Sequence, residues 1–462
     1  IQGTLHPRKG EDGQPYGMGF DLSLPDEWNG RFAFQGGGGI DGFLAPAVGM
    51  LTGTGPTPLE RGFATAASDG GHRDNGKPGE GGNFGFDQQA RKDYAYNALD
   101  TTILNSKKAV EKYYGKPISK SYFFGCSNGG RQGMLLSQRF PKHFDGIVAG
   151  APGFHLIELH FASISRGIAM QPYAPVESGQ VRLDKAIDAA DLKLVGNAVL
   201  KQCDAQDGVT DGIVSNTQAC HFDVDTLACK SGASTECLTP AKLAVVKAAV
   251  APVTTSKGQV LYPEMAFDTG IGESFWKASR FPASLPLVAK PQNVAFFQPP
   301  APELDPFTFN MDEALARTKD MRAWANADST DLSAFEKAGG KLLLYHGISD
   351  QIMTAKDTVQ YYEALAKREG GFNNAAEHTR LFLVPGMLHC AMGPGTDDFD
   401  LVKTITEWVE GGKAPERIVA KNEKLWPGRT RPLCPYPTYA HYKGNGDPEK
   451  AENFECRTPA KK

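Results

Sequence analysis

Ser121-Tyr122-Phe123-Phe124-Gly125-Cys126-Ser127-Asn128-Gly129 is the stretch that decides the fold, because a hydrophobic run here leads directly into G-x-S-x-G. Glycines on both sides of a serine permit a sharp strand-to-helix turn, which lifts the serine hydroxyl above the edge of a sheet. This geometry predicts that Ser127 is a nucleophile. The motif alone is a weak signal, since glycine-rich turns that contain a serine are common.

A cysteine stands beside this serine, and another cysteine stands beside a histidine. Cys126 precedes Ser127, and Cys390 follows His389. A disulfide holds the two Cβ atoms about 3.8 Å apart, so a bond between these cysteines would also bring Ser127 and His389 together. The double adjacency makes a catalytic serine and histidine a much stronger hypothesis than the motif alone.

The chain has eight cysteines, an even number that allows many pairings. Their order along the chain suggests one distant pair and three near pairs. Zinc is the competing interpretation, but the sequence has no C-x-x-C and no histidines clustered around the cysteines. Four disulfides would indicate an oxidising compartment, so we expect a secreted or periplasmic protein whose signal peptide is absent from this chain. The suggested pairs are Cys126 with Cys390, Cys203 with Cys220, Cys229 with Cys237, and Cys434 with Cys456.

Length and charge narrow the class of protein. A chain of 462 residues suggests about two to three domains, or one large domain with an insertion. The net charge is -4, without basic blocks, which gives no electrostatic footprint for nucleic acid or an anionic membrane. No apolar run approaches the roughly 18 residues of a spanning helix. We therefore expect a soluble protein that acts on a small molecule.

Hydrophobic periodicity predicts an α/β fold, in which strands alternate with helices around a mostly parallel sheet. Residues 154–325 are rich in loops, prolines and aromatics, and they carry four of the cysteines. We interpret them as a lid domain inserted into a catalytic domain formed by residues 1–153 and 326–462. The predicted strands are 20–24, 31–35, 121–124, 146–150, 341–345 and 379–384, and the predicted helices are 90–114 and 129–139.

An acid and a histidine follow the last two predicted strands. Asp350 and His389 lie where open α/β sheets place their sites, and the order Ser127, Asp350, His389 is that of an α/β-hydrolase triad. In that mechanism the histidine takes the proton from the serine, and the aspartate orients the imidazole. His346 is a rival base, but it lies within a predicted strand end and lacks the neighbouring cysteine.

The run Gly36–Gly39 resembles the glycine-rich oxyanion loop that follows an early strand in esterases. Backbone N–H groups there, together with that of Asn128, could stabilise a developing oxyanion. A competing interpretation is dinucleotide binding, because Gly37, Gly39 and Gly42 match G-x-G-x-x-G and Glu60 lies near the distance of a ribose-binding acid. The proline-rich stretch that follows makes a poor helix, which disfavours this alternative.

A further group of candidate site residues lies in the acidic loop Cys203–Ile213, which carries Asp204, Asp207 and Asp211. Carboxylates and backbone carbonyls are the oxygen ligands that calcium prefers. The spacing differs from that of an EF-hand, and a solvated acidic turn is the alternative interpretation. Any ion here would be structural, because no ligand belongs to the triad.

Taken together, these motifs resemble the tannase and feruloyl esterase family, which includes the mono(2-hydroxyethyl) terephthalate hydrolases. The resemblance implies an α/β-hydrolase core with an inserted, disulfide-rich, calcium-binding lid, the Ser127/Asp350/His389 triad and the Cys126–Cys390 bridge. It also implies oxyanion donors at Gly39 and Asn128 and calcium ligands at Asp204, Asp207, Val209, Asp211 and Ile213. The motifs that carry it are Gly125–Gly130, Ser137–Pro141, Cys203–Ile213, Tyr345–Gly347 with Asp350, and Val384–Cys390.

The resemblance implies a serine esterase that hydrolyses aromatic esters of the feruloyl type. The terephthalate-monoester enzymes bind the substrate carboxylate with a lid arginine, whereas residues 291–316 here contain no Arg or Lys. This difference favours neutral hydroxycinnamate esters, with a tannase or a terephthalate-monoester hydrolase as alternatives. Outside the class, the alternative is a non-catalytic calcium-binding protein. The lid aromatics could form a slot for a ring, although such residues more often form a lid core: Phe275, Trp276, Phe281, Phe296, Phe297, Phe307 and Phe309.

Overall fold

The computed structural model describes residues 1–50, 55–77, 79–230 and 236–460, and its centre is an eight-stranded sheet. The strands of this sheet are β1 (Gln2–Lys9), β2 (Pro15–Ser23), β3 (Arg31–Gln35), β4 (Ala64–Ser68), β5 (Lys120–Cys126), β6 (Gly146–Gly150), β11 (Lys341–Gly347) and β12 (Thr379–Val384). They lie in the order β1-β2-β4-β3-β5-β6-β11-β12. β1 and β2 pair in antiparallel fashion, as do β2 and β4, and all further neighbours are parallel. This mostly parallel sheet confirms the predicted α/β class.

Helices cover both faces of the sheet because successive side chains of a strand point to opposite sides. Phe123 of β5 packs into a core with the helices of one face, and Tyr122 and Phe124 pack into the core of the other face. The first core includes side chains of α2, α3, α11 and α12, and the second includes side chains of α14. The helices that contribute to these two cores are α2 (Ala98–Tyr114), α3 (Asn128–Arg139), α11 (Ser333–Lys337), α12 (Ala355–Arg368), α13 (Phe372–Ala375) and α14 (Leu401–Gly411). The short helix α1 (Gln88–Lys92) contributes Ala90 to a separate cluster.

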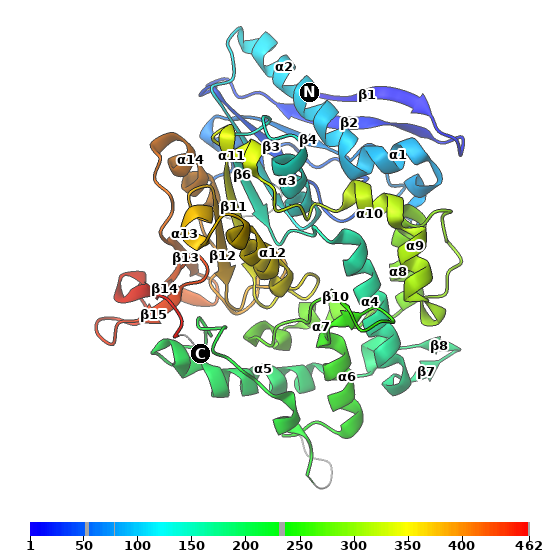
Figure 1. Ribbon diagram of the computed structural model, residues 1–462, viewed down its shortest axis with the longest axis vertical. Coiled ribbons are helices and arrows are strands. Elements are labelled where there is room, and N and C mark those ends of the chain that lie inside the picture. Colours follow the sequence, from blue (N-terminus) through cyan, green and yellow to red (C-terminus); the bar gives the residue numbers. More distant parts are fainter. Residues whose placement is uncertain (51–54, 78, 231–235, 461–462) are drawn as a thin grey trace.

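Between β6 and β11 the chain forms a large helical insert, which we call the insert from here on. Figure 1 shows most of it, in green, below the sheet. Much of the insert packs around a core of its own that includes Trp276, Phe281 and Leu285. The predicted lid falls in this region, and its limits at residues 154 and 325 stay a prediction. The elements are α4 (Leu156–Met170), β7 (Val176–Glu177), β8 (Gln180–Val181), α5 (Ala189–Cys203), α6 (Pro240–Val250), β9 (Val253–Thr254), β10 (Val260–Tyr262), α7 (Ser274–Arg280), α8 (Leu285–Phe296), α9 (Met311–Arg317) and α10 (Lys319–Ala325).

Disulfides tie these parts together, and all four predicted pairs are confirmed. One bond links distant segments, because Cys126 and Cys390 are 264 positions apart and their Cα atoms lie 6.0 Å apart. The other three close short loops. In the insert, Cys203 is bonded to Cys220 and Cys229 is bonded to Cys237, with Cα–Cα distances of 5.3 and 5.0 Å. Near the C-terminus, Cys434 is bonded to Cys456 at a Cα–Cα distance of 5.5 Å.

After α14 the chain ends in two antiparallel pairs of strands. They are β13 (Ile418–Asn422) with β14 (Trp426–Leu433), and β15 (Tyr439–Tyr442) with β16 (Phe454–Arg457). The Cys434–Cys456 bond connects the segment after β14 to β16. The described residues include no helix with the length and apolar character needed to cross a membrane.

Candidate active site

The turn that carries Ser127 is strained and tightly packed. Ser127 stands between the end of β5 and the start of α3, with φ at 65° and ψ at -125°. L-residues other than glycine rarely adopt positive φ, and such a residue costs on the order of 1–3 kcal/mol. A Cβ atom on Gly125 would lie 2.4 Å from the Gly129 carbonyl oxygen, and one on Gly130 would lie 2.2 Å from the Gly150 carbonyl oxygen. Only glycine therefore fits at these positions, and the strand, turn and helix hold the serine at the edge of the sheet.

The structure brings the predicted acid and base together. His389 Nδ1 lies 2.7 Å from Asp350 Oδ2, and the other carboxylate oxygen accepts N–H bonds from Ile352 and Met353 at 2.8 and 2.9 Å. Burial opposes ionisation of Asp350, but the neighbouring His389 and hydrogen bonds from His346 and His389 hold the pKa of Asp350 below its ordinary value. An ionised, fully oriented carboxylate can fix the imidazole tautomer and stabilise its charged form.

His346, the rival base, lies beneath the acid. Its ring is fully buried, with Nδ1 at 2.7 Å from Thr358 Oγ1 and Nε2 at 3.2 Å from the Met353 carbonyl oxygen. Nε2 also lies 3.2 Å from Asp350 Oδ2. His346 thus supports Asp350 from inside the core, whereas His389 lines the cavity that a substrate would enter.

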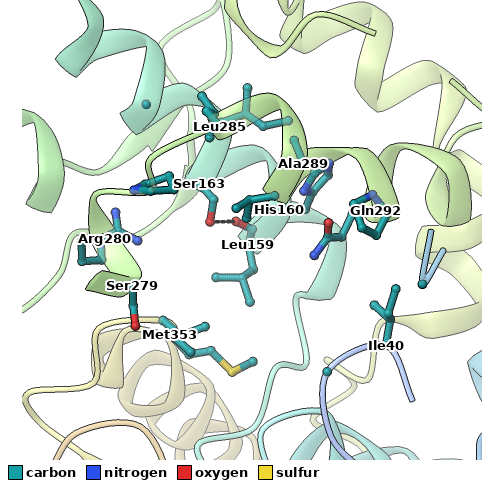
Figure 2. A pocket seen from close by; sticks show the side chains of 18 of the residues that line it. Ile40, Leu159, His160, Ser163, Ser279, Arg280, Leu285, Ala289, Gln292 and Met353 are labelled. Carbon is teal, nitrogen blue, oxygen red and sulfur yellow. Dashed lines mark hydrogen bonds between the residues drawn. The ribbon is translucent and has the colours of Figure 1, made fainter. Parts of the chain in front are cut away.

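Ser127 and His389 line one cavity of about 890 Å³ between the sheet and the insert. Between the described residues Ser127 and His389 there is no hydrogen bond from the hydroxyl to the imidazole, and catalytic hydrogen bonds often tighten only in the substrate complex. Apolar side chains such as Leu159, Leu285 and Met353 form much of the wall (Figure 2). A cavity of this size and character suits a small aromatic ligand.

The aromatic residues of the insert mostly form core rather than a slot for a ring. Trp276 and Phe281 belong to the core of the insert, and Phe297 and Phe309 pack with Phe161. Among the seven aromatic residues named from the sequence, Phe296 lines the cavity. This agrees with the interpretation, favoured from the sequence, that most of these residues form a lid core, and aliphatic side chains and methionine form much of the cavity wall instead.

A buried carboxylate joins the glycine loop to the helix that follows Ser127. The Asp41 carboxylate accepts hydrogen bonds from the Asn128 side chain and, at 2.8 Å, from Gln132 Nε2. Gln132 Oε1 in turn accepts the Gly37 N–H at 2.9 Å. Gly39, with φ at +57°, and Asn128 both line the cavity. The loop is therefore fixed over the helix N-terminus, which suits a pair of backbone oxyanion donors. Sequence reasoning missed Asp41 and Gln132, because the pattern that reveals them is a contact between distant segments.

The structure argues against dinucleotide binding at the same glycines. No helix begins at residues 37–50, which the structure describes in full. Glu60 instead accepts hydrogen bonds from the backbone and hydroxyl of Thr57 within its own turn. The helix that would bind the phosphates is therefore missing from its expected place, and the acid at the expected spacing is engaged within its own turn.

The acidic loop predicted to bind calcium follows α5, and the Cys203–Cys220 bond closes the segment that contains it. Asp204 accepts two backbone N–H bonds at 3.1 and 3.0 Å, Asp207 accepts that of Ser215 at 2.9 Å, and Asp211 pairs with Arg431. Burial raises the pKa of Asp207 to about 7, and the charge of Asp211 adds to this rise. Within the described part of the chain, no three His, Cys, Asp or Glu side chains form a group that could hold a metal. The loop thus offers the right oxygen atoms, but backbone donors and an arginine engage them.

Residues 3–457 match the sequence family described as tannase and feruloyl esterase. The chain belongs to this family. It is 41% identical to mono(2-hydroxyethyl) terephthalate hydrolase of Piscinibacter sakaiensis, over 99% of this chain and 84% of that protein. It is 31% identical to a probable feruloyl esterase B-2 of Neosartorya fischeri, over 94% of this chain and 82% of that protein. We conclude that the chain is a carboxylic ester hydrolase.

Solved structures of the family share the fold. Feruloyl esterase B from Aspergillus oryzae superposes with a TM-score of 0.81 at 26% identity, over 96% of this chain and 87% of that chain. Tannin acyl hydrolase from Aspergillus niger superposes with a TM-score of 0.70 at 21% identity, over 98% of this chain and 85% of that chain. The similarity to tannin acyl hydrolase concerns the fold alone.

Replacing the proposed nucleophile should abolish ester hydrolysis. We expect Ser127→Ala to lower kcat by several orders of magnitude, because only binding and the oxyanion donors remain. Ser163→Ala is a matched control, since Ser163 lines the same cavity and donates its hydroxyl to the Leu159 carbonyl at 3.1 Å. Turnover of an aromatic ester and the melting temperature should be measured for both. A folded Ser127→Ala enzyme with near-normal turnover would exclude the triad.

Removing the Cys126–Cys390 bond should harm activity more than folding. The bond adjoins both Ser127 and His389, and errors of about 1 Å in placement cost on the order of a hundredfold in rate. The control is the double alanine variant of Cys434 and Cys456, whose bond lies among the C-terminal strands. Turnover and circular dichroism, both measured below the melting temperature, separate a loss of activity from a loss of folded structure. Wild-type turnover in the variant without the Cys126–Cys390 bond would show that the position of these cysteines beside Ser127 and His389 is incidental.

Proposed function

We propose that this protein is a serine esterase of the α/β-hydrolase type that cleaves aromatic carboxylic esters through an acyl-enzyme. The observation that carries the proposal is the His389–Asp350 pair at 2.7 Å, in which His389 lines the same largely apolar cavity as the strained Ser127. A protein that only bound a ligand would have no use for a nucleophile, a base and an oriented acid together.

Each residue has a role in the reaction. Ser127 attacks the ester carbonyl while His389 accepts the hydroxyl proton, and the charge on Asp350 stabilises the imidazolium. The developing oxyanion lies against the backbone N–H groups of Gly39 and Asn128. His389 then gives its proton to the departing alcohol, which leaves the acyl group on Ser127. Water, activated by the same histidine, releases the acid and restores the serine.

For the acyl group we propose a hydroxycinnamate such as ferulate. The feruloyl esterases among the relatives support this choice, and the cavity offers enough apolar wall for one aromatic ring. The alternatives within the class are galloyl esters and terephthalate monoesters, which the names of other relatives suggest. All three have an acyl group in which an aromatic ring is conjugated with the reacting carbonyl, directly in the galloyl and terephthaloyl esters and through a C=C bond in the hydroxycinnamates.

A panel of three esters tests the acyl preference. We expect methyl ferulate to show the highest kcat/KM among methyl ferulate, methyl gallate and a terephthalate monoester. One methylene or one ring substituent in an apolar pocket changes the rate by about 10- to 200-fold, so the ranking should be clear. The control is an aliphatic ester whose acyl chain is as long as that of methyl ferulate. Faster cleavage of the aliphatic ester than of every aromatic one would contradict an aromatic ester hydrolase.

We also propose that the acidic loop binds a structural calcium ion. The ligands would be the carboxylates of Asp204, Asp207 and Asp211, with the carbonyls of Val209 and Ile213. Hard oxygen donors of this kind suit calcium, and an ion would relieve the repulsion that Asp211 exerts on the other two buried carboxylates. Asp211 would then share its carboxylate between the ion and Arg431.

Calcium removal should therefore lower stability without removing the catalytic groups. An ion at a hundredfold excess over its Kd stabilises the folded state by about 2.7 kcal/mol. We expect excess chelator to lower the melting temperature and added calcium to restore it. Asp207→Asn is the matched variant, and its melting temperature should respond little to either addition. An unchanged melting curve in chelator, together with no calcium by elemental analysis, would refute the site.

The four disulfides support the further proposal that the protein works outside the cytosol, in a secreted or periplasmic location. Disulfides persist in oxidising compartments and are rare where thiols are kept reduced.

A further inference from the structure

The side chain of Asn128, the residue after the nucleophile, is held between a buried cation and a buried carboxylate. Its Oδ1 accepts a hydrogen bond from Arg131 Nε at 2.7 Å, and its Nδ2 donates to Asp41 Oδ1. Asn128 is 1% exposed, Arg131 is fully buried, and Asp41 is buried as well. Because a guanidinium can only donate and an ionised carboxylate can only accept, these two bonds fix the orientation of the amide.

The cation of this group has no carboxylate in direct contact among the described residues. Arg131 Nη1 donates to the carbonyl oxygens of Ala95 and Ala325, both at 3.0 Å, and Ala325 ends α10. A buried charge normally needs a partner of opposite sign. The carboxylate that compensates Arg131 is Asp41, which it reaches through the Asn128 amide. Burial raises the pKa of Asp41 to about 7, and the charge of Arg131 is the largest effect that opposes this rise.

The carboxylate at the other end is confined against the glycine loop. Asp41 Oδ2 accepts a hydrogen bond from Gln132 Nε2 at 2.8 Å, and Gln132 Oε1 accepts the Gly37 N–H at 2.9 Å. The Asp41 backbone N–H donates to the Gly38 carbonyl at 2.9 Å. A Cβ atom on Gly37 would lie 2.8 Å from Asp41 Oδ1, and one on Gly70 would lie 2.6 Å from Asp41 Cβ. The carboxylate therefore has little room to move independently of the loop.

We propose that Arg131, Asn128 and Asp41 form an amide bridge, a set of positioning residues that fixes the spacing of the two oxyanion donors. The bridge rests on the proposed esterase function, which it deepens. One donor is the backbone N–H of Asn128 itself, and the other belongs to Gly39, two residues before Asp41. The bridging side chains act through these backbone groups and contact no reacting atom.

The amide bridge makes a demand that the oxyanion donors alone do not make. A backbone N–H at position 128 is available with almost any side chain, whereas the bridge needs an amide there. Donors that are fixed in advance stabilise an oxyanion without reorganisation, and errors of about 1 Å in placement cost on the order of a hundredfold in rate. The identity of the side chain at position 128 should therefore affect kcat.

Two isosteric single variants break the bridge at its centre. In Asn128→Asp the new carboxylate still accepts from Arg131, but it repels Asp41 instead of donating to it. In Asp41→Asn the new amide has one acceptor atom, where the carboxylate accepts from both Asn128 and Gln132. We expect each variant to lower kcat by about 10- to 100-fold with little change in KM, somewhat less than the loss of a whole oxyanion donor.

The double variant Asp41→Asn/Asn128→Asp reverses the central bond and keeps every contact of the bridge. The amide at position 41 donates to the carboxylate at position 128, which still accepts from Arg131, while the amide oxygen accepts from Gln132. We expect the double variant to regain about tenfold or more of the kcat lost in the single variants. A coupling of this size is within the range for two residues in one hydrogen-bond network.

An aromatic trifluoromethyl ketone separates misplaced oxyanion donors from a general loss of structure. Ser127 Oγ adds to the ketone carbon, its proton passes to His389, and the electrons of the C=O double bond move to the oxygen, which becomes the oxyanion. Since this adduct resembles the transition state, its affinity should fall and recover with kcat. The affinity for free ferulate, which forms no adduct, should change little. All assays are run well above pH 7, where Asp41 is ionised.

Asp87→Asn is the matched control. Asp87 is also a buried carboxylate, 1% exposed, and it binds Arg8 at 2.6 Å and the Ala90 N–H at 2.7 Å. It is not among the residues that line the cavity. We expect this variant to lower the melting temperature without changing kcat or the affinity for the ketone.

Three results would overturn the amide bridge. Near-wild-type kcat in both single variants would show that the backbone alone positions the donors. A folded double variant that stays as slow as the single variants would show that Asp41 and Asn128 are not coupled. A loss of affinity for free ferulate as large as the loss for the ketone would show a general disturbance of the cavity.

Failure to fold does not protect the proposal. If the variants at positions 41 and 128 do not fold, Gln132→Met removes the contact between the bridge and the Gly37 N–H. Unchanged kcat and ketone affinity in that variant would overturn the bridge. A wild-type protein that cleaves no ester would refute the esterase function and the bridge with it, whereas an active wild type with unaffected variants would overturn the bridge alone.

Discussion

The backbone conformation of Ser127 is the constraint on which the site depends. A residue with positive φ between a strand and a helix is unfavourable by itself, so the surrounding structure must enforce it. Gly125, Gly129 and Gly130 allow β5, α3 and the end of β6 to approach so closely that a Cβ atom would overlap backbone atoms at each position. The same close packing brings the glycine loop to the helix N-terminus, where Gly129 faces the Gly37 carbonyl oxygen.

The two halves of the active site come from distant parts of the chain, and covalent and electrostatic bonds hold them together. The Cys126–Cys390 bond ties the turn of the nucleophile to the loop of the histidine. Asp350 anchors His389 from below, and Gln351 holds the backbone of the same histidine. The insert also contributes, since the buried Asp268 accepts hydrogen bonds from Ser349 and from the Gly386 N–H. The insert therefore helps to order the catalytic loops as well as to enclose the cavity.

Local patterns in the sequence were enough to predict part of the fold. The strands at 31–35, 146–150 and 379–384 have the predicted limits because each is a short apolar run bounded by turn residues. The predicted helix 90–114 is interrupted by a π-helical turn at Asp93–Asn97, which periodicity does not reveal. β1 and β4 were missed, because β1 is an exposed edge strand and β4 consists of small residues. The predicted disulfides are confirmed, since cysteine adjacency and chain order were enough to indicate the pairs. The features that the sequence did not predict are contacts between distant polar residues: Asp41 and Gln132 are 91 positions apart, and Arg280 and Gln351 are 71 positions apart. In the acidic loop the carboxylates engage backbone donors and Arg431, contacts that composition does not reveal, and calcium binding there stays a proposal.

Labelling with a fluorophosphonate tests the central claim most directly, because the reagent phosphonylates a serine only when a base and an oxyanion site activate it. After proteolysis, mass spectrometry should find one modified peptide, the one that contains Ser127, and the labelling should disappear in His389→Ala. A native protein that takes no label, or that is labelled at another serine such as Ser163, would contradict the account.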